Sequence, residues 1–210
     1  MVSDCTACGT GRYSDAVAQT TENTCKDCGP GRYSTTDVGE SESVCTNCVA
    51  GKASSNDAAD KEDCVICGAG TYSLEKSKSC TPCPQGRYRG DAGGTQVTAC
   101  NACGGGRYSS GTGQTSDSTC KNCDSGKYST TIVGTSVGVC VKCPAGRFGE
   151  MEGAMILTEC SACGPGRYSS VEGADDESTC VDCVAGKYST TAVAVAATTC
   201  TDCPVGRYGE

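Results

Sequence analysis

The chain has 210 residues, a formal net charge of −8, and neither histidine nor tryptophan. Its 2 Leu, 3 Ile, 17 Val and 1 Phe make 23 of 210 residues, too few large apolar side chains for an ordinary hydrophobic core. The acidic balance argues against nucleic-acid binding, which needs basic side chains to neutralise phosphates, and no apolar run reaches the roughly 20 residues of a membrane span. The 22 cysteines instead indicate a disulfide scaffold.

Eleven Cys-x-x-Cys pairs follow one another along the chain, beginning at residues 5, 25, 45, 64, 80, 100, 120, 140, 160, 180 and 200. Eight of the ten intervals are 20 residues, and the other two are 19 and 16. A fixed period predicts a repeat array in which each module packs mainly on its neighbours. No signal peptide is visible before the first pair, so we expect a mature form or a fragment.

We expect four segments in chain order. Residues 1–79 hold irregular N-terminal modules, with intervals of 20, 20, 19 and 16 residues. Residues 80–139 and 140–199 form two three-module super-repeats, because proline follows the second cysteine at positions 84, 144 and 204, which are 60 residues apart. Residues 200–210 begin a further module. The 60-residue rhythm would follow if about three modules complete one turn, or if every third module meets a partner.

Each pair is followed by a common phrase: glycine three residues after the second cysteine in all eleven copies, then Arg or Lys in ten, then an aromatic in ten. Thr71 replaces the basic residue once, and Ala53 replaces the aromatic once. We expect each ring to stack in the array and cover a disulfide, and the basic side chain to lie over a ring of the next module. The alternative is a ligand-binding row of Arg and Tyr. The aromatics are Tyr13, Tyr33, Tyr72, Tyr88, Tyr108, Tyr128, Phe148, Tyr168, Tyr188 and Tyr208.

Between cysteine pairs, each module is predicted to hold a short extended piece, a turn, and a second extended piece that returns to the next cysteine. A glycine ten or eleven residues past the second cysteine suits the turn. No run has convincing helical periodicity, and residues 152–159 are the best short candidate. The turn glycines are Gly39, Gly94, Gly134, Gly153 and Gly173.

Two kinds of site fit the cysteine spacing. C-x2-C-x16-C-x2-C is typical of a four-cysteine zinc site, but eleven pairs is an odd number and the intervals are uniform. Disulfides fit better, either as a ladder or in 40-residue units that join first to first and second to second cysteines. The ladder would leave Cys5 and Cys203 as open ends that bridge to neighbouring segments. Its bridges are Cys8–Cys25, Cys28–Cys45, Cys48–Cys64, Cys67–Cys80, Cys83–Cys100, Cys103–Cys120, Cys123–Cys140, Cys143–Cys160, Cys163–Cys180 and Cys183–Cys200.

The phrase C-x-x-C-[GPV]-x-G-[RK]-Y-S resembles the ephrin-receptor-like cysteine-rich repeats of extracellular proteins and the first loop of tumour necrosis factor receptor modules. The resemblance implies a small disulfide-rich, β-poor repeat array: an elongated rod of about ten 20-residue cystine-closed modules, similar to EGF and tumour necrosis factor receptor modules, without a conventional hydrophobic core. In the receptors a cysteine before such a phrase closes forward, as in the ladder. The chain lacks their second module type, so no ligand site carries over.

We therefore predict a non-enzymatic protein, extracellular or at the cell surface, that builds a fibre, filament or surface appendage with copies of itself or with a longer chain of the same repeats. The alternative is a ligand-binding receptor or adhesin stalk, with a protein ligand at residues 151–157 or at the irregular residues 45–80. A zinc-binding array is the third reading. We predict no catalytic, cofactor-binding or metal-binding residue, no nucleic-acid partner and no membrane span, and the Ser/Thr-rich return segments are candidates for O-linked glycans.

Overall fold

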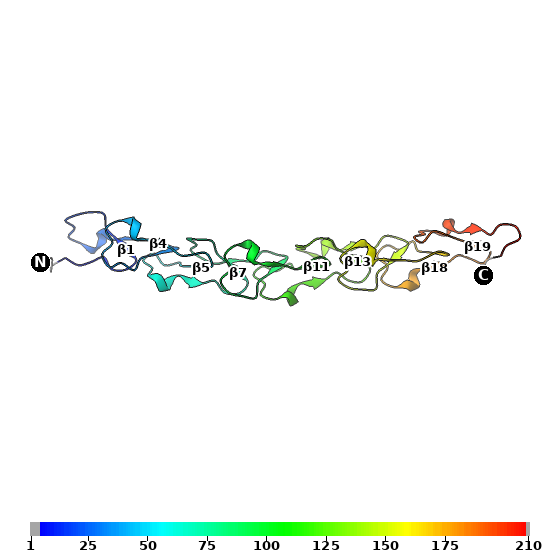
Figure 1. Ribbon diagram of the computed structural model, residues 1–210, viewed down its shortest axis with the longest axis horizontal. Helices are drawn as coiled ribbons and strands as arrows, with labels where there is room; N and C mark the ends of the chain where they lie inside the picture. Colours follow the sequence, from blue (N-terminus) through cyan, green and yellow to red (C-terminus); the bar gives the residue numbers. More distant parts are fainter. Residues whose placement is uncertain (1–4, 209–210) are drawn as a thin grey trace. The chain divides into compact units, whose positions relative to one another are not determined.

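The computed structural model describes residues 5–208, and it shows a series of closed loops that each carry one antiparallel two-stranded hairpin (Figure 1). The described residues contain ten such hairpins, nine single 3₁₀ turns and no α-helix. The hairpins are β1 (Arg12–Tyr13) with β2 (Lys26–Asp27), β3 (Arg32–Tyr33) with β4 (Thr46–Asn47), β5 (Lys52–Ala53) with β6 (Val65–Ile66), β7 (Thr71–Tyr72) with β8 (Thr81–Pro82), β9 (Arg87–Tyr88) with β10 (Asn101–Ala102), β11 (Arg107–Tyr108) with β12 (Lys121–Asn122), β13 (Lys127–Tyr128) with β14 (Val141–Lys142), β15 (Arg147–Phe148) with β16 (Ser161–Ala162), β17 (Arg167–Tyr168) with β18 (Val181–Asp182), and β19 (Lys187–Tyr188) with β20 (Thr201–Asp202).

Each hairpin pairs the basic–aromatic dipeptide of one phrase with the two residues between the next two cysteines. In β11 and β12, Arg107 lies opposite Asn122 and Tyr108 lies opposite Lys121. Two-residue strands make too few hydrogen bonds to be stable alone, so the flanking disulfide must hold them. The predicted β-poor array of cystine-closed modules is confirmed.

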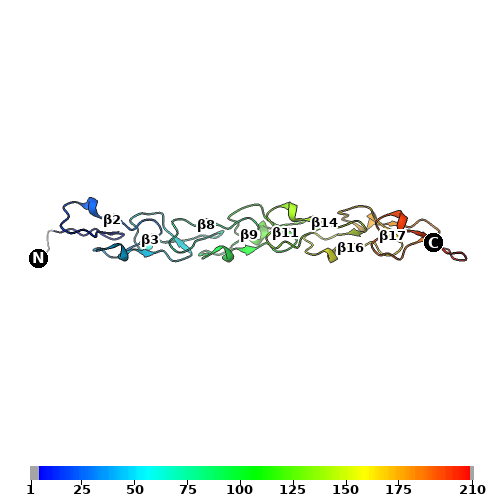
Figure 2. The same ribbon diagram turned by 90° about the horizontal axis from the view of Figure 1, so that it is seen from above.

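The 3₁₀ turns lie just before the closing cysteine of nine loops, and they recur along the chain (Figure 2). The predicted helical candidate at residues 152–159 contains only η7, which is the same turn as in the other modules. The turns are η1 (Glu22–Thr24), η2 (Glu42–Val44), η3 (Lys61–Asp63), η4 (Val97–Ala99), η5 (Asp117–Thr119), η6 (Val137–Val139), η7 (Leu157–Glu159), η8 (Glu177–Thr179) and η9 (Ala197–Thr199).

A tight turn precedes each first strand. In the turn before β13, the Lys127 amide donates to the Asp124 carbonyl at 3.2 Å, and Gly126 has φ of 73°. A turn with a positive φ at its third residue favours glycine there. Proline suits the second position of such a turn, and Pro30 occupies it before Gly31.

The turn role expected of five glycines is right for two of them. Gly153 and Gly173 have φ of 73° and 72°, as a left-handed turn residue should. Gly39, Gly94 and Gly134 do not have positive φ. They instead follow the turn as main-chain partners of the preceding module: Gly94 and Gly134 form parallel bridges with an aromatic residue, and Gly39 accepts the Ser14 amide at 2.8 Å. The glycines ten and eleven residues past the second cysteine therefore occupy two adjacent positions with different roles, which the sequence pattern did not distinguish.

Cysteine and small side chains make up the buried interior. Seven cysteines are almost completely buried, and serines and alanines fill much of the rest. Phe148, which is 8% exposed, clusters with Cys163, Ala174 and Cys180. A chain poor in large apolar residues thus covers its disulfides instead of building a conventional core. The seven are Cys48, Cys67, Cys83, Cys100, Cys123, Cys143 and Cys160.

The described residues form two compact units, residues 5–101 with 112–116, and residues 102–111 with 117–208. Within the first unit, the Gly11 amide donates to the Ser34 carbonyl of the next module at 3.0 Å. Within the second, the Gly106 amide donates to the Ser129 carbonyl at 2.7 Å. The segment boundaries at residues 79, 139 and 199 stay a prediction. Among the described residues, no helix is long and apolar enough to cross a membrane.

Candidate functional site

The repeated module interface is the candidate site, and the disulfides are its foundation. Ten bridges are present, with Cα–Cα distances from 5.4 to 5.9 Å, and they are the ladder pairs. They close separations of 17 residues in eight loops, 16 in Cys48–Cys64 and 13 in Cys67–Cys80. The alternative 40-residue pairing is not found. Cys5 is exposed, Cys203 is partly exposed, and both lie outside the bridges.

The bridges bear on the zinc alternative. A four-cysteine zinc site needs four thiolates, and the ladder leaves only Cys5 and Cys203 unpaired. Within residues 5–208, no three Cys, Asp or Glu side chains gather as metal ligands would. In the acidic segment 57–63, Asp60 and Asp63 form a capping box at the start of η3.

The basic residue of the phrase crosses its own loop. Arg107 donates from Nη1 to both Asp117 carboxylate oxygens at 2.9 and 3.0 Å, and from Nη2 to the Asp117 and Cys120 carbonyls at 2.8 and 3.2 Å. Arg32 binds Glu42 and the Cys45 carbonyl in the same manner. These charge-assisted bonds tie the first strand to the 3₁₀ turn and the closing cysteine.

The expected stacking of these arginines over a ring of the next module is therefore wrong. The cation–ring contact found among the described residues is different: Lys26 Nζ lies 5.9 Å from the centroid of Tyr13, its partner across one hairpin. A planar guanidinium near several carbonyls and a carboxylate gains more from hydrogen bonds than from a ring face. The spacing of ten residues from Arg107 to Asp117 was the overlooked sequence signal.

The aromatic residue contacts the following module. Phe148 forms a parallel bridge with Ala174, and its ring clusters with Cys163 and Cys180, which form the bridge of that module. Here the predicted cover of a disulfide is present. Most tyrosines of this register are half-buried, whereas Tyr188 and Tyr208 are 43% and 85% exposed.

In seven phrases the glycine packs against the module after next, whereas a Cβ at Gly166, Gly186 or Gly206 would have no atom within 4 Å. A Cβ at Gly106 would lie 2.0 Å from the Gly153 carbonyl oxygen, and one at Gly126 would lie 2.3 Å from that of Gly173. Both glycines also have positive φ, of 71° and 73°. The sequence predicted a turn glycine, but not this second reason for it.

The serine that follows the aromatic in the phrase has a structural role that the sequence did not predict. Ser34 and Ser129 are 1% exposed, and their Oγ atoms accept the amides of Thr36 and Thr131 at 3.2 Å. Such a hydrogen bond joins residues two positions apart, so it fixes the loop conformation without a side chain from elsewhere in the chain. Its signal was visible, because serine follows the aromatic register in eight modules.

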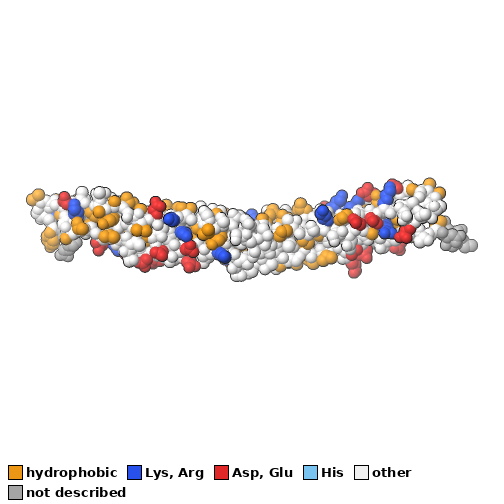
Figure 3. Space-filling model, turned by 180° about the vertical axis from the view of Figure 1, so that it is seen from behind, with side chains coloured by type: hydrophobic (Ala, Val, Ile, Leu, Met, Phe, Trp, Pro, Cys, Tyr) orange, Lys and Arg blue, Asp and Glu red, His pale blue; other side chains and the backbone are white. Residues whose placement is uncertain are grey.

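Ion pairs within single modules lie at the surface, and Figure 3 shows acidic and basic side chains close together on the face that it draws. The Arg32 guanidinium lowers the pKa of Glu42, chiefly through a hydrogen bond. Lys26 lowers the pKa of Asp15 in the same way, and Asp15 raises the pKa of Lys26. Lys127 lowers the pKa of Asp124. These groups stay charged at neutral pH.

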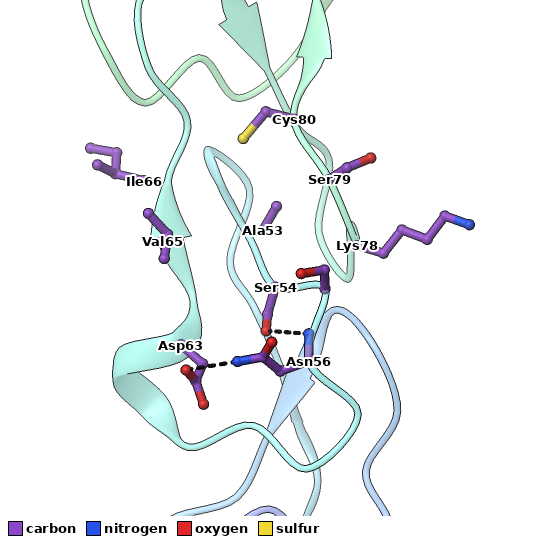
Figure 4. A pocket seen from close by; sticks show the side chains of 10 residues that line it. Ala53, Ser54, Asn56, Asp63, Val65, Ile66, Lys78, Ser79 and Cys80 are labelled. Carbon is purple, nitrogen blue, oxygen red and sulfur yellow. Dashed lines mark hydrogen bonds between the residues drawn. The ribbon is translucent and has the colours of Figure 1, made fainter.

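Two cavities lie in the first unit. One, of about 350 Å³, is lined by Ala53, Val65, Asp63 and Cys80 among others (Figure 4). The other, of about 630 Å³, lies beside Cys5. The alternative ligand segment at residues 151–157 lines neither cavity, although Met151, 65% exposed, and its apolar neighbours are open to solvent.

Residues 70–120 match the family model described as tyrosine-protein kinase ephrin type A/B receptor-like. The modules resemble ephrin-receptor-like repeats. The matched residues carry the same phrase and the same ladder bridges as the rest of the chain, so the predicted resemblance is confirmed. Ephrin-receptor-like repeats are non-catalytic receptor modules, and disulfide-rich repeats of this kind are consistent with an extracellular protein. No curated protein matches the chain.

Proposed function

We propose that this chain is a structural, non-enzymatic extracellular protein whose modules build a fibre, filament or surface appendage. One observation carries the proposal: the same three-part interface recurs along each unit. Each module has its own disulfide, successive modules bind through main-chain hydrogen bonds, and in seven modules the phrase glycine abuts the module after next. An interface that recurs from module to module suits extension rather than a single binding event.

The proposal includes the two cysteines outside the ladder. Cys5 and Cys203 continue the alternation of first and second cysteines, and they are exposed and partly exposed respectively. We expect each to form a disulfide with a neighbouring segment, either in copies of this chain or in a longer chain of the same repeats. O-linked glycans on exposed Ser and Thr side chains are part of the proposal, and a mass decrease after O-deglycosylation of native material tests them.

The test compares the oxidised chain with a variant that carries both Cys5→Ser and Cys203→Ser. We expect the parent to form covalent multimers on non-reducing gels and elongated assemblies in negative-stain electron microscopy. The variant keeps the ten ladder bridges, which peptide mapping by mass spectrometry verifies, but it should lose the covalent multimers. Short single particles and free Cys5 and Cys203 thiols in native, alkylated material would refute the fibre proposal.

A second candidate function is a ligand-binding receptor or adhesin stalk. The cavity at Ala53 favours it, because this cavity lies within the irregular residues 45–80 and departs from the repeated pattern. A distinct recess in one module suits recognition of a partner better than it suits extension of an array.

A further inference from the structure

One module lacks the ring that its register holds elsewhere. Ala53 takes the place of the aromatic in β5, where it lies opposite Val65 and is 7% exposed. Ten other modules place Tyr or Phe at this register. A small residue at a register that is otherwise filled by a ring leaves unoccupied volume unless the surroundings collapse.

Phe148 shows what a ring at this register contacts. It packs on Cys163, Cys180 and Ala174 of the next module. The counterpart of Cys180 beside Ala53 is Cys80, since both are the closing cysteine of the following loop. Cys80 lines the cavity together with Ala53 and is partly exposed, whereas Cys180 is buried.

The following loop is also shortened, which opens the cavity to solvent. The Ser77 carbonyl accepts a hydrogen bond from the Ser54 amide, and at the equivalent position of another module the Ala154 carbonyl accepts one from the Ser129 amide. From Ser77 to Cys80 is three residues, whereas from Ala154 to Cys160 is six. The missing residues are those of the 3₁₀ turn, and this loop has none. Ala53 and the shortened loop therefore together leave a recess of about 350 Å³.

The walls of the recess differ in character. Val65 and Ile66, 63% and 55% exposed, form an aliphatic rim, whereas the other second strands carry at least one residue that is not aliphatic. At the base, Asn56 donates to Asp63 at 2.9 Å, and its amide donates to Ser54 Oγ (Figure 4). These groups can meet a phenolic hydroxyl. The adjoining residues 57–63 contain four acidic residues and one lysine.

We propose that this recess binds a tyrosine or phenylalanine side chain of a protein partner, next to an arginine or lysine of that partner. The ring would occupy the register vacated at Ala53 and lie against Cys80 and Val65, as Phe148 lies against its own neighbours. The acidic segment 57–63 selects a basic neighbour by charge complementarity. This inference deepens the second candidate function and rests on it; the fibre proposal does not depend on it.

The test uses the full oxidised chain with labelled isoleucine methyl groups. The chain has three isoleucines, so Ile66 reports on the recess and Ile132 and Ile156 serve as internal controls. The probe is the peptide acetyl-Gly-Arg-Tyr-Ser-amide, with peptides in which Tyr is replaced by Ala, or Arg by Glu. We expect the probe to shift Ile66 alone, and each altered peptide to bind about tenfold more weakly.

Two variants locate the binding. Ala53→Tyr restores the ring in place and should abolish the Ile66 shift, whereas Ala185→Tyr adds a ring at an exposed position and should leave it unchanged. Mapping of all ten bridges verifies folding. Val65→Ser changes an exposed side chain, so it tests the recess independently of Ala53→Tyr; it should weaken binding about fivefold.

Several outcomes would overturn the proposal. An unchanged Ile66 shift in both Ala53→Tyr and Val65→Ser would place the peptide elsewhere. Equal Ile66 shifts with the peptide in which Ala replaces Tyr would show that the ring is not recognised. Equal Ile66 shifts with the peptide in which Glu replaces Arg would show that the basic neighbour is not recognised. An Ile66 shift that grows with protein concentration without peptide would assign the recess to a second copy of the chain. Loss of multimers in the Cys5 and Cys203 test leaves all these readouts unaffected.

Discussion

Alanine substitutions at two glycines of one loop separate the two reasons for the phrase glycine, which are its positive φ and its contact with another module. Gly104 has φ of 87° and nothing within 4 Å of a hypothetical Cβ, so Gly104→Ala introduces backbone strain alone. Gly106 has φ of 71° and a Cβ there would lie 2.0 Å from the Gly153 oxygen, so Gly106→Ala adds a clash. Gly138 lies in η6 without positive φ, and its nearest neighbour would be Ser136 Oγ at 3.4 Å. It is the control.

The expected magnitudes follow from this geometry. An L residue held at positive φ costs about 1–2 kcal/mol, which is the whole effect of Gly104→Ala. Added volume in a packed contact costs about 1–3 kcal/mol more, so Gly106→Ala should lose about 2–5 kcal/mol. Gly138→Ala should be neutral or stabilise by about 0.4–1 kcal/mol, because alanine restricts the unfolded chain more than glycine does.

Hydrogen exchange is the suitable assay, since a repeat array opens locally and the free energy of each opening is read at individual amides. The informative amide is that of Gly153, which donates to the Cys123 carbonyl at 2.8 Å. Its protection should fall in Gly106→Ala and stay unchanged in Gly104→Ala. Equal loss of Gly153 protection in both variants would refute the contact between a module and the module after next.

Three further predictions test the other contacts. Arg107→Lys should lower the local free energy of unfolding by about 1–3 kcal/mol, measured by exchange at the Cys120 amide, because lysine cannot reproduce the forked hydrogen bonds; Lys121→Gln, at an exposed site, should change little. Arg32 lowers the folded-state pKa of Glu42, so its stabilisation is complete above the unfolded pKa and is lost as pH falls through the folded pKa. Urea unfolding in acid should show this loss, and Glu42→Gln should remove that part of the pH dependence. Phe148→Ala should cost about 3–5 kcal/mol and Phe148→Tyr much less, measured by denaturant unfolding; equal effects would contradict ring packing on the disulfide.

Much of the local structure could be predicted from the residues alone. Uniform spacing made each loop a similar closed unit, and the ladder pairs observed are those expected from it. The two-strand modules and the turn at the phrase glycine are local, and a cystine with a glycine at positive φ leaves a short loop few other conformations. The turn position was predicted less well, because Gly39 and Gly153 belong to adjacent registers that differ in φ.

The amino-acid sequence by itself determined the local fold of the module, its disulfide and the side chains that recur from module to module, because these depend on contacts within about 17 residues. The tertiary structure alone decided which modules touch. It placed Gly153 against Gly106 and left the recess beside Ala53 unfilled. Those outcomes depend on how successive loops pack in space. Steric exclusion and hydrogen-bond geometry then distinguish residues that occupy the same position in the repeat pattern.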